Sequence, residues 1–187
     1  DLDHYRENRW HSWTEEDECC PSSPYGLAKQ TVENYLGFFY QQYGLNSVCF
    51  RYANVYGPRQ NPKGEAGVVC LFSDKIKANL PLNVFGLGHQ TRDYIHVSDV
   101  TQANMLALQN NIGGVYNIGT DTETSVLELI EHFESALGRK LEVNHLPFIP
   151  GELNRTCLNY DKFMIATKWS PKITLEQGLR DLLVSSA

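Results

Sequence analysis

Apolar residues near the start of the chain follow a helical spacing. From Tyr25 to Tyr43 they fall on almost every side of a predicted helix, which Gly44 ends as a C-terminal cap. A helix that is apolar around most of its circumference is typical of one buried on two sides, against a core and a partner. Residues 1–23 have little periodicity and predict a loop.

The rest of the chain alternates short β-rich runs with helical patterns. Residues 54–67 carry several glycines and prolines and predict a loop. Ser125 with Glu128, and Thr174 with Gln177, have the spacing of capping boxes. The alternation predicts an α/β fold with a largely parallel sheet. The strands are expected at residues 47–52, 81–86, 92–97 and 114–119, and the helices at 67–80, 98–109, 125–138 and 175–183.

Composition and charge narrow the class of protein. The 187 residues are 42% hydrophobic, and the net charge of -6 argues against nucleic acid and anionic membranes as partners. No apolar run approaches the roughly 20 residues of a membrane span, and the polar opening DLDHYREN does not resemble a signal peptide. We therefore expect a cytoplasmic protein of one domain or a little more.

The cysteines and glycines predict what kinds of site to expect. Five cysteines without C-x-x-C or Cys/His ligand spacing predict reduced thiols and no metal site. Dinucleotide-binding sheets carry a glycine-rich turn such as G-x-G-x-x-G, and this sequence contains none. The glycines of GLGHQ, at residues 86–90, precede a predicted strand rather than a helix, so this segment is not that motif.

The stretch PYGLAK contains a candidate acid–base pair. Tyr25 and Lys29 are spaced i, i+4, which places both on one face of the predicted helix. A nearby ammonium favours the phenolate form of a tyrosine and so makes it a better base. The same spacing often arises by chance on ordinary amphipathic helices, so the motif alone leaves both interpretations open.

Five motifs in chain order resemble those of nucleotide-sugar epimerases and dehydratases, the extended short-chain dehydrogenases. They are PSSPYGLAKQTVENYL, RYANVYGPRQNPKGEAG, PLNVFGLGHQTRDYIHVSDV, YNIGTDTETSVLELI and SPKITLEQGLRDLL. The resemblance runs from about residue 12 to the end, and it is closest to UDP-glucose 4-epimerases. It implies the C-terminal part of a doubly wound, Rossmann-type parallel sheet plus a small α/β nucleotide-sugar domain.

The resemblance also implies how the chain divides. Residues 1–60 would be the end of the NAD-binding part, without its glycine-rich turn. Residues 61–187 would be mostly the nucleotide-sugar domain, with 92–118 returning to the Rossmann part. The family's catalytic Ser or Thr that precedes the tyrosine is not found, and residues 1–13 do not match the family. We therefore expect a truncated member.

The resemblance assigns the NAD-side roles to three residues. Tyr25 would be the acid/base that moves the proton of a sugar hydroxyl while NAD takes the hydride from the same carbon. Lys29 would bind the nicotinamide ribose and stabilise the phenolate. Tyr52, in RYANVYGPRQ, would also contact the cofactor.

The nucleotide-sugar side is implied by four further residues. Asn54 matches a contact to the diphosphate, and Arg92 matches a phosphate-binding arginine whose planar guanidinium suits this group. Val84 and Phe85 match residues beside the uracil base. Taken singly, each has an ordinary alternative: Asn54 as a turn residue, Arg92 in a surface ion pair, and Phe85 in the core.

The sequence departs from the family pattern in the segment PGELNRTCLNYDK. Ile149 stands where a phosphate-binding arginine is usual, and Arg155 is the candidate to replace it. Thr156 stands where a bulky side chain restricts the sugar 2-substituent in some epimerases, which suggests tolerance of UDP-N-acetylhexosamines.

Two alternatives remain at the level of sequence. One is a non-catalytic fragment that binds nucleotide sugar or associates with itself. Helix 25–43 resembles the family's dimer helix, so a homodimer through it, or a swapped assembly, is expected. The other is a 4,6-dehydratase, which needs an additional acid–base pair before Tyr25. Glu15, Glu16 and Asp17 are predicted to lie in a solvated acidic loop, which leaves them unassigned.

Overall fold

The computed structural model describes residues 11–21, 23–63, 66–149 and 153–184. The helices are α1 Pro24–Tyr43, α2 Val68–Lys77, α3 Val97–Asn110, α4 Val126–Leu137, α5 Asp161–Thr167 and α6 Leu175–Val184. The strands are β1 Val48–Tyr52, β2 Asn54–Tyr56, β3 Leu82–Phe85, β4 Thr91–Arg92, β5 Tyr94–His96, β6 Gly114–Ile118, β7 Thr124–Ser125 and β8 Val143–Leu146. Within the described ranges, no helix has the length and apolar character needed to cross a membrane.

Strand pairing is mostly parallel, as the sequence predicts. Among the described strands, β1 pairs with β6, β2 with β5 and β3 with β8, all in parallel. Only β4 and β7 pair in the antiparallel sense. Parallel partners need long crossover connections, and the helices between the strands supply them. The chain is therefore α/β, with the parallel pairing of a Rossmann-type sheet.

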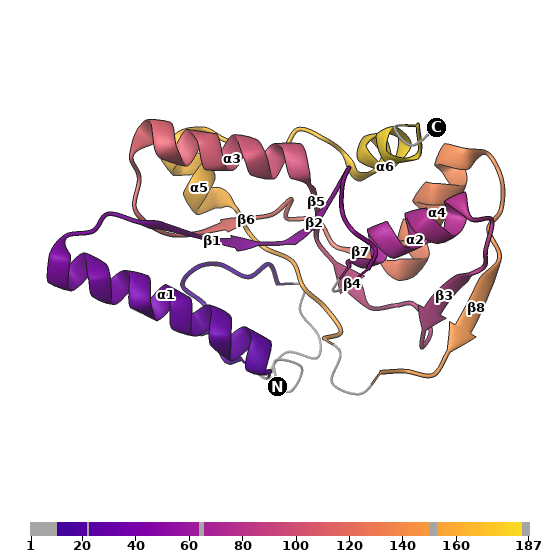
Figure 1. The fold of residues 1–187 in the computed structure, drawn as a ribbon, viewed down its shortest axis with the longest axis horizontal. Coiled ribbons are helices and arrows are strands. Elements are labelled where there is room, and N and C mark those ends of the chain that lie inside the picture. Colours follow the sequence, from indigo (N-terminus) through magenta and orange to yellow (C-terminus); the bar gives the residue numbers. More distant parts are fainter. Residues whose placement is uncertain (1–10, 22, 64–65, 150–152, 185–187) are drawn as a thin grey trace.

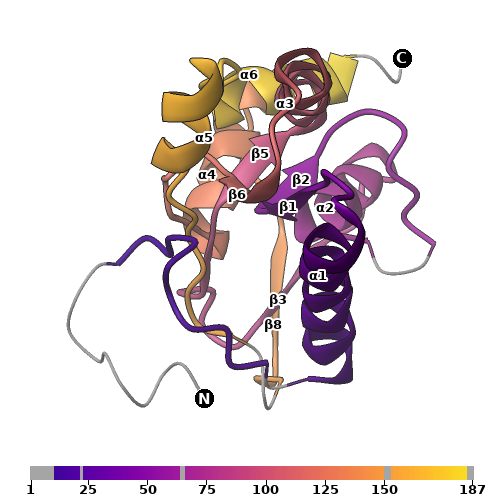
Figure 2. The ribbon, with the colours of Figure 1, turned by 90° about the vertical axis from the view of Figure 1, so that its left-hand side faces the viewer.

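The elements are arranged as two lobes that meet at β2 and β5 (Figure 1). One lobe holds β1 and β6, with α3 and α5 on one side and α1 on the other, as the turned view also shows (Figure 2). The other lobe holds β3 and β8 together with α2, α4 and α6.

Each lobe has its own hydrophobic core, and β5 contributes to both. Successive side chains of a strand point to opposite faces, so Tyr94 enters one core and Ile95 the other. The first core combines residues of α2, β3, α4 and α6, and the second combines α3, β6 and α5. The sequence-based division at residue 60 stays a prediction, and Phe163 of α5 packs in the second core together with residues of α3 and β6.

Local signals in the sequence fix several helix ends. Gly44 ends α1 with a left-handed φ of 66°, and its N–H donates to the Tyr40 carbonyl at 2.9 Å. The capping box of α4 is confirmed, since both reciprocal hydrogen bonds of Ser125 and Glu128 are present. The Thr174 hydroxyl accepts from the Gln177 N–H at 3.3 Å at the start of α6.

Three expectations are wrong or incomplete. Residues 54–56 form strand β2 instead of loop, because β5 supplies a parallel partner that the local sequence does not reveal. Helix α1 is less buried against the core than expected, since none of its residues is buried against the described part of the chain, and its burial against a partner stays a prediction. Strand β8 and helix α5 were not predicted at all; β8 alternates only weakly, and α5 is seven residues long.

Candidate functional site

A cavity of about 580 Å³ opens where β2, β3 and β4 face α2. It gathers four candidate residues of the nucleotide-sugar side, namely Asn54, Val84, Phe85 and Arg92. In the sequence these residues are spread over 39 positions, from 54 to 92. The remaining lining residues are Pro62, Val68, Leu71, Phe72, Asp74, Lys75, Asn83, Gln90, Tyr94, Val126 and Ile149. An apolar pocket with a few convergent polar groups is the usual form of a small-molecule site.

Two neighbouring apolar residues of the lining differ in exposure. Val84 is buried at 1% exposure within β3, whereas Phe85, the next residue, is 38% exposed at the rim. Phe85 is therefore not a core residue, which removes the ordinary alternative considered for it. Its exposed ring offers a face to a planar ligand.

Strand pairing positions Asn54. Its N–H donates to the Asp93 carbonyl at 2.8 Å, and its Cα lies opposite Tyr94 in the parallel register of β2 and β5. The residue is exposed and belongs to a strand, so its interpretation as a turn residue is also removed.

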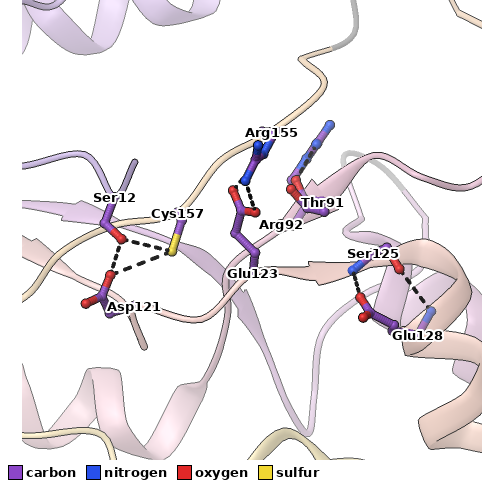
Figure 3. A network of polar contacts seen from close by, with 9 residues as sticks. All are labelled: Ser12, Thr91, Arg92, Asp121, Glu123, Ser125, Glu128, Arg155 and Cys157. Carbon is purple, nitrogen blue, oxygen red and sulfur yellow. Dashed lines mark hydrogen bonds and ion pairs between the residues drawn. The ribbon is translucent and has the colours of Figure 1, made fainter. Parts of the chain in front are cut away.

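Arg92 lies on the short strand β4, opposite Thr124 of β7. Its Nη1 donates to the Thr91 carbonyl at 2.8 Å, which bends the guanidinium back over its own strand (Figure 3). The strand in turn is held on its other edge by a parallel bridge between Thr91 and Arg155.

The neighbouring Asp93 fixes this strand in place, a role that sequence reasoning missed. The carboxylate is 1% exposed, and it accepts hydrogen bonds from the Thr120 hydroxyl at 2.6 Å and the Leu158 N–H at 3.2 Å. Burial raises the pKa of Asp93, and these hydrogen bonds act in the opposite direction. A Cβ on Gly119 would collide with this carboxylate, so the glycine of GVYNIG allows the close approach.

Arg155 and Thr156 are not among the residues that line the cavity. The Arg155 guanidinium instead forms a two-point ion pair with Glu123, at 2.6 and 3.1 Å (Figure 3). These hydrogen bonds raise the pKa of Arg155. The Thr156 N–H donates to the Thr91 carbonyl at 3.2 Å, while its hydroxyl is buried without a hydrogen-bond partner.

Tyr25 and Lys29 lie side by side on the first turns of α1. The Lys29 Nζ lies 5.3 Å from the centroid of the Tyr25 ring, and the tyrosine is 64% exposed. Ser23 starts this helix, since its Oγ accepts from the Gly26 N–H at 3.1 Å. The pair does not line the cavity described above.

Tyr52 lies at the end of β1 and is 44% exposed. Its hydroxyl and the side-chain amide of Asn104 on α3 are within hydrogen-bond distance, at 3.0 Å from the amide nitrogen.

The acidic loop before α1 is less solvated than the sequence suggests. A Glu15 oxygen accepts the Asn117 N–H at 2.6 Å, and Asp17 accepts from Thr14 and contacts His11 at 3.1 Å. Glu16 alone of the three acidic residues is exposed. The expectation of a solvated loop is therefore wrong for Glu15 and Asp17, because they satisfy backbone groups of the folded chain.

The model of the NAD dependent epimerase/dehydratase family matches residues 6–119. A putative UDP-glucose 4-epimerase of Methanocaldococcus jannaschii is 42% identical over 160 residues, which cover 86% of this chain and 52% of that protein. A dTDP-glucose 4,6-dehydratase of Streptomyces niveus is 32% identical over 90% of this chain and 50% of its own length.

Solved structures are similar over almost the whole chain. The UDP-glucose 4-epimerase of Thermotoga maritima with UDP-glucose has a TM-score of 0.88 and 40% identity, over 95% of this chain and 58% of that one. The Thermus thermophilus enzyme in complex with NAD has a TM-score of 0.82 and 37% identity, over 92% and 58%. The chain spans about half the length of the curated relatives it matches.

Proposed function

Because the chain belongs to the NAD dependent epimerase/dehydratase family, we propose that it carries the acid–base pair and the nucleotide-sugar site of a UDP-hexose 4-epimerase. The cavity that gathers Asn54, Val84, Phe85 and Arg92 is the observation that carries the proposal. These residues were selected from sequence motifs alone, and a shared cavity is what a common ligand requires.

The proposed ligand pose follows from the chemistry of the lining. The uracil ring lies against Phe85 and Val84 at the apolar end, where the aromatic ring offers a stacking surface. The diphosphate lies toward Arg92 and Asn54, since a guanidinium and an amide both donate to phosphate oxygens. With Ile149 in place of a cation, Arg92 and Lys75 are the two cations among the described lining residues.

The proposed chemistry needs a proton carrier at the sugar. Tyr25 removes the proton of the sugar hydroxyl and later returns it, and the Lys29 ammonium stabilises the phenolate that forms between these steps. NAD, when bound, supplies hydride transfer to and from the same carbon. In a 4-epimerase the keto sugar rotates between the two transfers, so that the hydride returns to its other face.

The residues present fit one end of NAD. The exposed Lys29 and Tyr52 are suited to the nicotinamide ribose, with Lys29 donating to its hydroxyls. The sequence has no glycine-rich turn for the pyrophosphate, so the rest of the cofactor would need residues that this chain does not supply.

Arg155 and Thr156 are proposed to act at the sugar end of the site. Glu123 holds Arg155 by two hydrogen bonds, which fixes its guanidinium for a second contact to the ligand. Thr156 is small, which supports tolerance of a 2-acetamido group. Replacing Thr156 with Tyr should then weaken UDP-GlcNAc binding relative to UDP-glucose, and an unaltered ratio would refute the hypothesis.

A homodimer through α1 is the proposed assembly. Eight large apolar side chains of this helix are exposed, at 41% to 72%, and no α1 residue is buried. An apolar surface of this extent is typical of an interface. Analytical ultracentrifugation tests the assembly, and a stable monomer at high protein concentration would contradict it. Tyr25, the proposed acid/base, is one of the eight and is expected to stay outside the interface; the other seven are Leu27, Val32, Tyr35, Phe38, Phe39, Tyr40 and Tyr43.

Specific contacts bear on the two alternatives to a 4-epimerase, the 4,6-dehydratase and the non-catalytic fragment. A 4,6-dehydratase needs a free acid–base pair near Tyr25, and the hydrogen bonds of Glu15 and Asp17 weigh against those two residues. A non-catalytic fragment would bind nucleotide sugar in the same cavity as the proposed 4-epimerase and would differ from it only in lacking turnover.

Isothermal titration calorimetry of the chain with UDP, UDP-glucose and NAD, each alone, tests the proposal. We expect UDP and UDP-glucose to bind without NAD, because the cavity lies apart from the Tyr25–Lys29 pair. Absence of UDP binding would overturn the nucleotide-sugar assignment. Binding without turnover, in a preparation supplied with NAD, would favour the non-catalytic alternative.

A further inference from the structure

Two adjacent cysteines form a thiol pair that the proposed function does not use. Cys19 and Cys20 are the only exposed cysteines of the chain, and all five cysteines are free. The two exposed residues are consecutive, so rotation about their side-chain torsions can bring the two sulfur atoms together. A disulfide or an electrophile can therefore meet two thiols at a single point of the surface.

Burial separates these two thiols from the other three. Cys70 and Cys157 are buried and Cys49 is half-buried. Burial raises the pKa of Cys49 and of Cys70, and raises that of Cys157 to about 12. Since the thiolate is the nucleophile and needs access to its target, thiol chemistry should be concentrated on the exposed pair.

The surroundings of Cys19 favour it as the first nucleophile. The pKa of Arg51 is raised, chiefly by its hydrogen bonds to Glu33 and in smaller part by Cys19, which therefore lies within electrostatic reach of the guanidinium. Glu33 is neutralised by the same arginine at 2.6 Å, so it opposes a Cys19 thiolate only weakly. A positive charge within reach of Cys19 attracts the anionic sulfur that attacks a disulfide.

The pair lies on a segment that is fixed to α1. The Cys19 carbonyl accepts a hydrogen bond from the Gln30 side chain at 3.0 Å. Pro21 packs against Gly26, where an added Cβ would lie 3.2 Å from the proline Cβ. The segment leads directly to the Ser23 cap and Tyr25, so a change in its covalent structure acts where α1 begins.

We propose that Cys19 and Cys20 are a redox-sensitive vicinal dithiol that reacts reversibly with low-molecular-weight disulfides. The Cys19 thiolate attacks one sulfur of the small disulfide, forms a mixed disulfide and releases one small thiolate. The Cys20 thiolate then attacks the Cys19 sulfur and releases the second. The two cysteines lose two electrons and two protons, and the small disulfide is reduced to two thiols.

Chain geometry makes the product easy to reverse. Consecutive Cα atoms lie about 3.8 Å apart, whereas ordinary disulfides join Cα atoms about 4.4–6.8 Å apart. A bridge between neighbours is therefore strained, and strained exposed disulfides are the readily reduced ones. This property suits a reversible modification better than a permanent structural link.

Incubation of the protein with oxidised glutathione, followed by peptide mass spectrometry, tests the proposal. We expect the peptide with both cysteines to lose two hydrogen atoms and to regain them with dithiothreitol. Cys20→Ser should trap glutathione on Cys19, while Cys19→Ser should react much more slowly. Cys49→Ser serves as the matched control and should behave as the unmodified protein does.

Three results would overturn the proposal. One is a peptide that remains fully reduced under conditions that oxidise a free dithiol. Another is glutathione that accumulates first on Cys49 of the unmodified protein. The third is a Cys20→Ser variant that carries no adduct at Cys19. The experiment measures covalent chemistry only, so its outcome does not depend on the proposed epimerase function.

Discussion

The Lys29 ammonium lies over the ring of Tyr25, 5.3 Å from its centroid, at the exposed N-terminal end of α1. One helical turn separates the two residues, and this spacing brings their side chains to the same face. Ser23 caps this end of the helix and thereby sets where the first turn starts. The relationship is the geometric basis of the proposed acid–base role.

Removing the phenol should abolish most of the proposed turnover. In the full-length enzyme, Tyr25→Phe is expected to lower kcat by about 10²- to 10⁴-fold, the usual contribution of a positioned acid–base group. UDP affinity should be unchanged, because Tyr25 does not line the nucleotide cavity. Tyr35→Phe, an equally exposed tyrosine of the same helix, is the control. Wild-type kcat for Tyr25→Phe would contradict the assignment.

Arg92 should carry a large share of diphosphate affinity. Arg92→Gln is expected to weaken UDP binding by about 10- to 100-fold, since hydrogen bonds to charged groups contribute about 1.5–3 kcal/mol. Arg180→Gln is the matched control, because it removes a guanidinium that forms an exposed ion pair with Glu176 on α6. Equal UDP affinities for the two variants in calorimetry would count against the proposed pose.

Two glycine-to-alanine substitutions should have opposite effects on stability. Gly178→Ala on α6 is expected to destabilise the fold by about 1–3 kcal/mol, because the new Cβ would collide with the buried Tyr56 hydroxyl. Gly37→Ala on α1 meets no atom within 4 Å and should stabilise by up to about 1 kcal/mol through helix propensity. Urea unfolding of both variants measures the difference, and a stabilising Gly178→Ala would show that the α6 contact is wrong.

His96 should make stability depend on pH. Burial lowers its pKa in the folded state, while Asp99 and Asp181 oppose this shift. Below the unfolded value of about 6.5 the unfolded chain binds more protons than the folded one, so stability should fall as the pH drops through that range. The stabilising contribution of neutral His96 should be fully present above about pH 6.5.

His96→Asn separates this titration from the capping role of the residue. The His96 Nδ1 accepts the Ser98 N–H at 3.3 Å, and asparagine is also a good N-cap. Urea unfolding at about pH 5 and about pH 7.5 should therefore show a smaller pH effect for His96→Asn. His145→Asn, at an exposed position, is the control. An unchanged pH dependence in His96→Asn would assign the effect to another group.

Local residue chemistry was sufficient to predict five of the six described helices, all but the seven-residue α5. The Gly44 cap, the Ser125–Glu128 capping box and the i, i+4 pair on α1 each depend on residues within one or two helical turns. Such interactions form wherever the chain is helical, so they can be read from spacing alone. Motif resemblance then identified the four residues that share the cavity.

Long-range pairing decided what the sequence could not reveal. Asn54–Tyr56 becomes a strand only because β5, nearly 40 residues later, lies beside it. Glu15 is partly buried because it accepts a backbone N–H of β6. The Arg155 side chain pairs with Glu123, and its backbone forms a bridge with Thr91. Each of these contacts joins segments far apart in the chain, so their energies depend on tertiary structure. The sequence by itself determined these five helices and the candidate chemistry, whereas the tertiary structure decided which side chains share a cavity and which are held by other parts of the fold.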